Sequence, residues 1–180
     1  MSDGPGAGAR MLSRCLESLS VRGLHSARTR HSKRTLNSIN MPSIRDLADQ
    51  HPELFRGDRK ETVDRLRAVE KALDVRLPPD VRWLLLECGY GAVHAVSNIQ
   101  QSIDDTFRFR ASAGLDPRYV VLDDKGDAGV VLLDTSDESG PVVWADWRSA
   151  GLLHTGTSDS ELFKSFSAWV EDRILDLGDE

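Results

Sequence analysis

The chain has 180 residues, of which 39% are hydrophobic and 29% are charged. This length supports one domain whose core needs neither disulfides nor a metal ion. No run approaches the ~18 consecutive apolar residues of a membrane span, and the N-terminus lacks the apolar segment of a secretory signal. The two cysteines, Cys15 and Cys88, are isolated, which suits a reducing compartment. We therefore expect a soluble cytoplasmic protein that does not enter a membrane.

Residues 1–40 differ in composition from the rest of the chain. They are rich in Ser, Gly, Arg and Thr, have no aromatic residue, and carry seven basic and two acidic residues, a charge of +5. Such a segment buries too little apolar surface to fold, which predicts a disordered basic arm. Two other interpretations stay open. The composition resembles an organelle transit peptide, and Met41, where globular patterning begins, is a candidate true start. The folded domain is predicted to span residues 41–180.

The remaining residues, 41–180, hold 16 basic and 27 acidic residues, a net charge of −11. Like-charge repulsion then disfavours nucleic acid, and the field steers basic partners over about one Debye length, roughly 8–10 Å. The arm has the charge to meet nucleic acid or an anionic membrane, but it lacks interleaved aromatic residues for base stacking. We expect neither nucleic acid nor membrane to bind the folded domain.

The first predicted elements of the domain are helices. Ser43 can cap a short helix that ends at about Gln50. Asp58, followed by Glu61, predicts a capping box at the start of a second helix. The apolar positions of that helix share one stripe at helical spacing: Val63, Leu66, Val69 and Leu73.

The next segment, residues 77–80, predicts a break between helices, because Leu-Pro-Pro-Asp ends one helix and places a proline where the next can begin. The third helix, residues 81–87, is densely apolar, so we expect it to be buried nearly all round. Gly89 then predicts a left-handed cap. Residues 93–99 favour a short strand, and residues 102–113 fit a helix or a loop equally well.

Three strands are predicted over residues 119–122, 129–133 and 141–147. Gly126 can take positive φ in the first turn, and residues 134–140 form a polar loop, so the strands indicate an antiparallel meander. A capping box at residues 158–161 predicts a closing helix, whose apolar face is Leu162, Phe166, Trp169, Val170 and Ile174. Helices, then strands, then one helix predict an α+β fold.

No motif in the sequence predicts catalysis. The best nucleophile candidate is Cys88, with His94 six residues later. An apolar, acidic setting raises a thiol pKa, which favours a buried structural thiol. The histidines lack ligand spacing, and the acids around Gly126 do not match a calcium loop, which needs alternating acids before its glycine. We expect no enzyme, no metal site and no cofactor.

Five motifs follow one another between about residues 58 and 175. A helix carrying Glu70 precedes Leu77-Pro78, an apolar helix and a split glycine pair; Gly126-Asp127, a strand with Trp144, and Ser165-Phe166-x-x-Trp169 come later. This order resembles the SUKH superfamily, which includes the Smi/Knr cell-wall regulators of yeast. Tyr90, between the two glycines, and residues 92–117 depart from that pattern. The resemblance assigns structural roles to Glu70, Leu77, Pro78, Gly89, Gly91, Gly126, Trp144, Phe166 and Trp169. We expect Glu70 to accept backbone donors from the loop at Gly89.

The resemblance implies a non-catalytic protein-binding domain. Many bacterial members are immunity proteins that neutralise toxins delivered between cells, and a charge of −11 suits a basic, nuclease-like toxin. The residues expected at the partner interface are Asp123, Asp124, Asp127, Asp134, Asp137, Glu138 and Trp147. A merely solubilising role stays open for each of these acids. The alternative function is an intracellular regulatory or scaffold module of the yeast type, which a genuine basic arm would favour.

Overall fold

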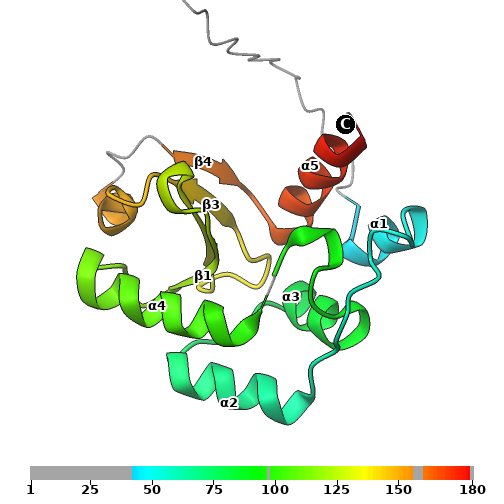
Figure 1. Ribbon diagram of the computed structural model, residues 1–180, viewed down its shortest axis with the longest axis horizontal. Helices are drawn as coiled ribbons and strands as arrows, with labels where there is room; N and C mark the ends of the chain where they lie inside the picture. The colour runs from blue at the N-terminus through cyan, green and yellow to red at the C-terminus, as the bar shows by residue number, and fades with distance from the viewer. Residues whose placement is uncertain (1–41, 97, 156–159, 179–180) are drawn as a thin grey trace, which may run out of the picture. The chain divides into compact units, whose positions relative to one another are not determined.

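The computed structural model describes residues 42–96, 98–155 and 160–178 (Figure 1). The predicted basic arm and the candidate start at Met41 lie outside the described residues, and so do Ser158 and Asp159 of the predicted capping box.

Helix α1 (Ile44–Gln50) begins and ends where the sequence predicts. The Ser43 hydroxyl accepts a hydrogen bond from the Asp46 backbone N–H, and the Asp46 carboxylate accepts one from the Ser43 N–H at 2.9 Å. This arrangement is a reciprocal capping box. The Ser43 hydroxyl also donates to the Asp46 carboxylate at 2.8 Å. This bond and the one from the Ser43 N–H hold the pKa of Asp46 below its ordinary value, because both favour the charged carboxylate.

Helix α2 (Val63–Leu73) is capped by Thr62, whose hydroxyl accepts a hydrogen bond from the Arg65 N–H. The prediction that Asp58 caps this helix is therefore wrong. Glu61, the expected partner of Asp58, is instead buried against another part of the chain. The predicted stripe is confirmed at Leu66, Val69 and Leu73, whereas Val63 in the first turn is exposed.

Helix α3 (Pro79–Trp83) starts at a proline, as predicted, and continues into a π-helical turn, η1 (Leu84–Cys88). Leu84 and Leu85 are fully buried, but Trp83 and Leu86 are only half-buried. The expectation of burial nearly all round is therefore wrong. Gly89 ends the turn with φ 92° and ψ −172°, a positive φ as expected but not the left-handed helical conformation.

No strand forms in the described part of the segment predicted as one, residues 93–96, 98 and 99. A short 3-10 turn, η2 (Ala92–His94), lies there, and helix α4 (Ile99–Ala113) follows. The Asn98 side chain caps α4 by accepting from the N–H groups of Gln100 and Gln101. Residues 102–113, which the pattern left open between helix and loop, are helical.

The four strands form an antiparallel meander in the order β1-β2-β3-β4. They are β1 (Tyr119–Asp124), β2 (Val130–Asp134), β3 (Val142–Ala145) and β4 (Ser160–Phe163). The first three confirm the predicted strands, although β3 ends at Ala145 and leaves Trp147 beyond it. The fourth replaces part of the predicted closing helix. Its Leu162, expected on the apolar face of that helix, is 63% exposed.

The closing helix α5 (Phe166–Gly178) begins after β4. The Ser165 hydroxyl accepts from the Ala168 N–H at 3.1 Å, so Ser165 takes the capping role assigned to residues 158–161. Phe166, Trp169, Val170 and Ile174 are buried as predicted.

Side chains on the two faces of the sheet enter two cores. On one face, Val120, Val131 and Val142 pack with residues of α1, α2, α3 and α5. On the other, Val121, Leu132 and Val143 pack with Phe109 of α4 and with the turn η4 (Ala150–Thr155). The predicted α+β fold is confirmed. In the described ranges, no helix is both long and apolar enough to cross a membrane.

Candidate functional site

The six acids predicted at the partner interface lie at opposite ends of the β1–β2 hairpin. Tyr119 pairs with Asp134 at one end, and Asp124 pairs with Val130 at the other. The register therefore separates the acids 123–127 from the acids 134–138, and they form two clusters instead of one patch.

At the first end, two of the three acids are matched by neighbouring bases. Asp123 lies 2.5 Å from Lys125 Nζ, and Asp124 lies 2.5 Å from Nη2 of Arg108 on α4. Asp127 is exposed, and the described residues offer it no ion pair. Of these three acids, Asp127 alone therefore carries a charge that the described residues leave unmatched.

At the second end, Asp134 lies 3.6 Å from Arg118 Nε. Asp137 and Glu138 are exposed in the β2–β3 loop, and no ion pair reaches them from the described residues. The Asp137 carboxylate accepts from the Ser139 N–H at 2.7 Å, and this bonding to Ser139 lowers the pKa of Asp137. Asp137 is thus charged at neutral pH and is held in place by its own turn.

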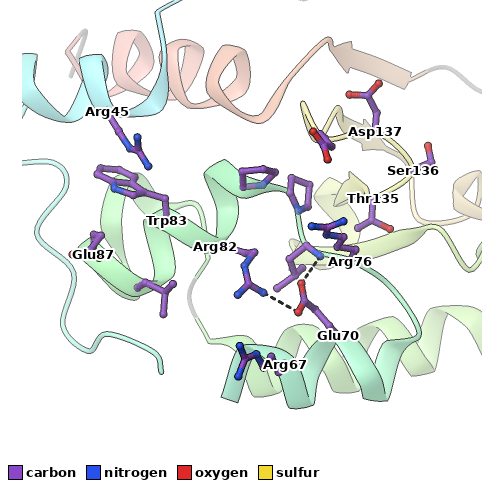
Figure 2. A pocket seen from close by; sticks show the side chains of 15 residues that line it. Arg45, Arg67, Glu70, Arg76, Arg82, Trp83, Glu87, Thr135, Ser136 and Asp137 are labelled. Carbon is purple, nitrogen blue, oxygen red and sulfur yellow. Dashed lines mark hydrogen bonds and ion pairs between the residues drawn. The ribbon is translucent and has the colours of Figure 1, made fainter. Parts of the chain in front are cut away.

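Asp137 and Glu138 also line a cavity of about 710 Å³ (Figure 2). We call it the α2–α3 cavity. Its floor comes from the α2–α3 linker, α3 and η1, and its walls from α1, α2 and the β2–β3 loop. The lining includes Leu77, Pro78, Pro79, Trp83, Leu86, Glu70, Glu87 and four arginines, Arg45, Arg67, Arg76 and Arg82. Its volume is that of a ligand or peptide pocket.

Glu70 stabilises the floor of this cavity through a hydrogen bond and an ion pair. Its Oε1 accepts from the Leu77 N–H at 2.9 Å, and its Oε2 lies 2.8 Å from Nη1 of Arg82 (Figure 2). The expectation that Glu70 accepts donors from the loop at Gly89 is therefore wrong. The carboxylate instead accepts a hydrogen bond from the backbone N–H of Leu77, at the start of the Leu-Pro segment that follows α2.

The β2–β3 loop is held against the cavity floor by close contact at Gly140. This glycine has φ 60°, and a Cβ there would lie 2.8 Å from Pro78 Cγ. Any larger residue would push the loop off Pro78. This contact therefore keeps the loop that carries Asp137 and Glu138 next to Pro78.

The arginines of the cavity differ in their partners. Arg82 is paired with Glu70, and Arg67 lies 3.5 Å from Asp64. The Arg45 guanidinium lies 5.8 Å from the Trp83 ring centroid, and Figure 2 shows the two side chains together. Arg76 is exposed, and no hydrogen bond or ion pair joins it to a described residue. Sequence reasoning missed this set, because the arginines come from four separate segments: α1, α2, the α2–α3 linker and α3.

The tryptophans divide into structural and exposed ones. Trp144 donates from Nε1 to the Ala128 carbonyl at 3.2 Å, and Trp169 is buried on α5 beside Phe166. Trp147 is 41% exposed after β3, with the Arg148 guanidinium 5.0 Å from its ring centroid. Its exposure leaves it able to contact a partner. Because β3 ends beside the start of β2, Trp147 follows the same end of the sheet as the Asp127 turn.

A second polar pair that sequence reasoning missed lies below η1. The Tyr90 hydroxyl donates to the buried Glu61 carboxylate, and Arg59 Nη2 lies 3.6 Å from the same carboxylate. Burial, with this bond second, raises the pKa of Tyr90. The backbone reinforces the contact, since the Glu61 N–H donates to Leu85 O at 2.9 Å. The available signal in the sequence was Tyr90 itself, which splits the glycine pair.

The candidate catalytic pair, Cys88 and His94, differs in exposure. Cys88 is buried, and burial is the largest effect raising its pKa. His94 is exposed, and no hydrogen bond between the two is found in the described ranges. Within the same ranges, no three His, Cys, Asp or Glu side chains gather closely enough to hold a metal ion.

These features define an α+β domain with a preformed cavity and separated acidic clusters. The model of the SMI1 / KNR4 family (SUKH-1) matches residues 60–172. This span covers more than half of the chain, so the chain belongs to that family. The match begins just before α2 and ends within α5, close to the span of the motifs. A comparison with curated proteins finds no match.

Proposed function

We propose that this domain binds a protein partner without catalysis, and that the partner is a basic toxin domain which it neutralises in the cytoplasm. Membership of the SUKH-1 family supports a binding domain. The observation that carries the choice of partner is the net charge of −11 over residues 41–180.

The net negative charge of the domain acts mainly on the rate at which it meets a basic partner. Complementary potential raises association rates and disfavours like-charged competitors. The ion pairs indicate which acids contribute most to attracting a basic partner. Asp123, Asp124 and Asp134 face their own bases, whereas Asp127, Asp137 and Glu138 present unmatched charge to a partner. We therefore assign steering chiefly to these last three side chains.

The absence of catalysis is part of the proposal. A nucleophilic cysteine needs a lowered pKa and access to substrate, and Cys88 has a raised pKa and is buried. Neutralisation then acts by occlusion: the bound domain covers the toxin's own active surface. Such a mechanism requires one-to-one binding and no turnover.

The proposal is tested by capture with the full chain carrying a C-terminal tag. The tagged chain is incubated with the native lysate, and bound proteins are quantified by mass spectrometry. Recovery of one basic domain at near-equal stoichiometry is the expected result, with a chain carrying Asp127→Lys, Asp137→Lys and Glu138→Lys as the matched control. Recovery of cell-envelope regulators alone would favour the scaffold alternative, and equal recovery by the control would contradict the role of the three acids.

A further inference from the structure

We infer that the α2–α3 cavity is the docking site for a partner segment that places a carboxylate on Arg76 and an apolar side chain on the floor at Pro79 and Trp83. This inference rests on the proposed binding function and adds the chemistry of the segment that docks.

The floor of the cavity exposes apolar side chains that the fold does not cover. Trp83 and Leu86 belong to the most apolar stretch of the chain, yet both are only half-buried, because each lines the cavity. Tryptophan and arginine in a concave surface are the residue types that dominate protein-binding hot spots. The floor therefore suits a leucine-sized or aromatic side chain of a partner.

Arg76 supplies the polar anchor. The other three arginines are engaged by Glu70, by Asp64 or by the Trp83 ring. Arg76 has no such partner among the described residues, although it follows α2 directly and lines the cavity. A guanidinium presents a planar set of donors that matches a carboxylate at two points. Its free donors favour a carboxylate as the bound group.

The acidic residues that line the cavity limit which kind of anionic ligand can bind. Glu87, Asp137 and Glu138 line the same cavity. A polyphosphate or nucleic acid, with a charge on every unit, would meet these carboxylates as well as Arg76. A peptide with one carboxylate beside apolar residues meets only the arginine. A protein segment is therefore favoured, and it can belong to a partner that is basic overall.

The site is also formed before binding. Glu70 holds the Leu77 N–H and Arg82 in place, and Gly140 packs on Pro78. A rigid cavity avoids the ordering cost of an induced one.

Selection from a random heptapeptide display library on the immobilised full chain tests the inference. A chain of net charge −6 enriches basic peptides if charge alone governs binding. We expect instead enrichment of peptides with Asp or Glu next to Leu, Phe or Trp. Arg76→Glu should reverse the preference at the acidic position to Lys or Arg and weaken the selected peptides about tenfold or more. Arg56→Glu, the same change at an exposed site outside the cavity, should leave the selection unchanged.

Enrichment of basic peptides by the wild-type chain, or an unchanged selection with Arg76→Glu, overturns the docking inference. The inference is also overturned if Arg56→Glu and Arg76→Glu weaken binding of the selected peptides to the same extent. These results leave the proposed function standing, because capture of a basic toxin by the acidic clusters does not require the cavity. If no toxin is captured but the peptide selection gives the expected result, the proposed function is wrong and the cavity is still a peptide-binding site.

Discussion

Oε2 of Glu70 lies 2.8 Å from Nη1 of Arg82, and this ion pair ties α2 to α3 beneath the cavity. The same carboxylate accepts the Leu77 N–H. One side chain therefore stabilises both the end of α2 and the entry to α3. The motif glutamate and the Leu-Pro that follows it form one structural unit.

Replacing Glu70 should destabilise the domain, because Glu70→Ala leaves the Leu77 N–H without its acceptor and Arg82 without its counter-charge. We expect a loss of about 1–2 kcal/mol in the free energy of unfolding, measured by urea denaturation. Glu70→Gln keeps an acceptor and should lose about half as much. Asp64→Ala, which removes a highly exposed ion pair with Arg67, should stay within ~0.5 kcal/mol. Equal stability of Glu70→Ala and wild type would refute this role.

Removing the Tyr90 hydroxyl should cost about 1–3 kcal/mol at pH 8, because Tyr90→Phe leaves the buried Glu61 carboxylate without that donor. The cost should shrink at high pH. The folded state raises the pKa of Tyr90, so this tyrosine stabilises the fold below the unfolded pKa of about 10 and loses that contribution as pH rises above it. Unfolding free energies at pH 8 and pH 11 check this, with Tyr119→Phe as the comparison. A constant difference between wild type and Tyr90→Phe contradicts the linkage.

Two glycines of the β1–β2 turn should respond differently to alanine. Gly129 has φ 118°, and a Cβ there would lie 2.6 Å from Trp144 Nε1. Gly126 has φ 61° and open space around it. Gly126→Ala should cost about 1–2 kcal/mol for the positive φ alone. Gly129→Ala should cost clearly more, because it also displaces Trp144 and its bond to Ala128. Thermal unfolding of both variants gives the ranking, and the reverse order would show that the Trp144 contact is unimportant.

The Cys88 thiol should react slowly in the folded chain. Burial covers it and raises its pKa, so little thiolate is present at pH 8. Alkylation followed by peptide mapping, which separates Cys88 from Cys15, should show protection that disappears in urea. Cys88→Ala should retain full partner capture. Lost capture by a folded Cys88→Ala chain would contradict a purely structural role for this thiol.

The sequence predicted correctly those elements that are specified by neighbouring residues, such as helix caps and apolar stripes. Ser43 caps α1 through its immediate neighbours, and the stripe of α2 has plain helical spacing. Helix α4 was hidden because its buried side includes Ser102 and Thr106, whose hydroxyls bond to backbone groups of β1. A polar residue on the inner face breaks the apolar period that predicts a helix.

The nonlocal features could not be predicted in the same way. Strand β4 is defined by pairing with β3, while its Leu162 stays exposed. The α2–α3 cavity takes part of its lining from the β2–β3 loop, which packs on Pro78 far away in the sequence. Asp127, Asp137 and Glu138 lie in the connections between strands, as expected. Asp123 and Asp124 lie at the end of β1 and Asp134 at the end of β2, so their expected placement in turns is wrong. The division of the six acids into two clusters follows from the hairpin register.

The most direct test of the account is titration of the captured partner's toxic activity with the full chain. We predict that activity falls to zero at one equivalent, and that the chain with Asp127→Lys, Asp137→Lys and Glu138→Lys associates several-fold more slowly at low ionic strength. A partner that stays fully active while saturated with the chain would contradict neutralisation and favour a regulatory scaffold.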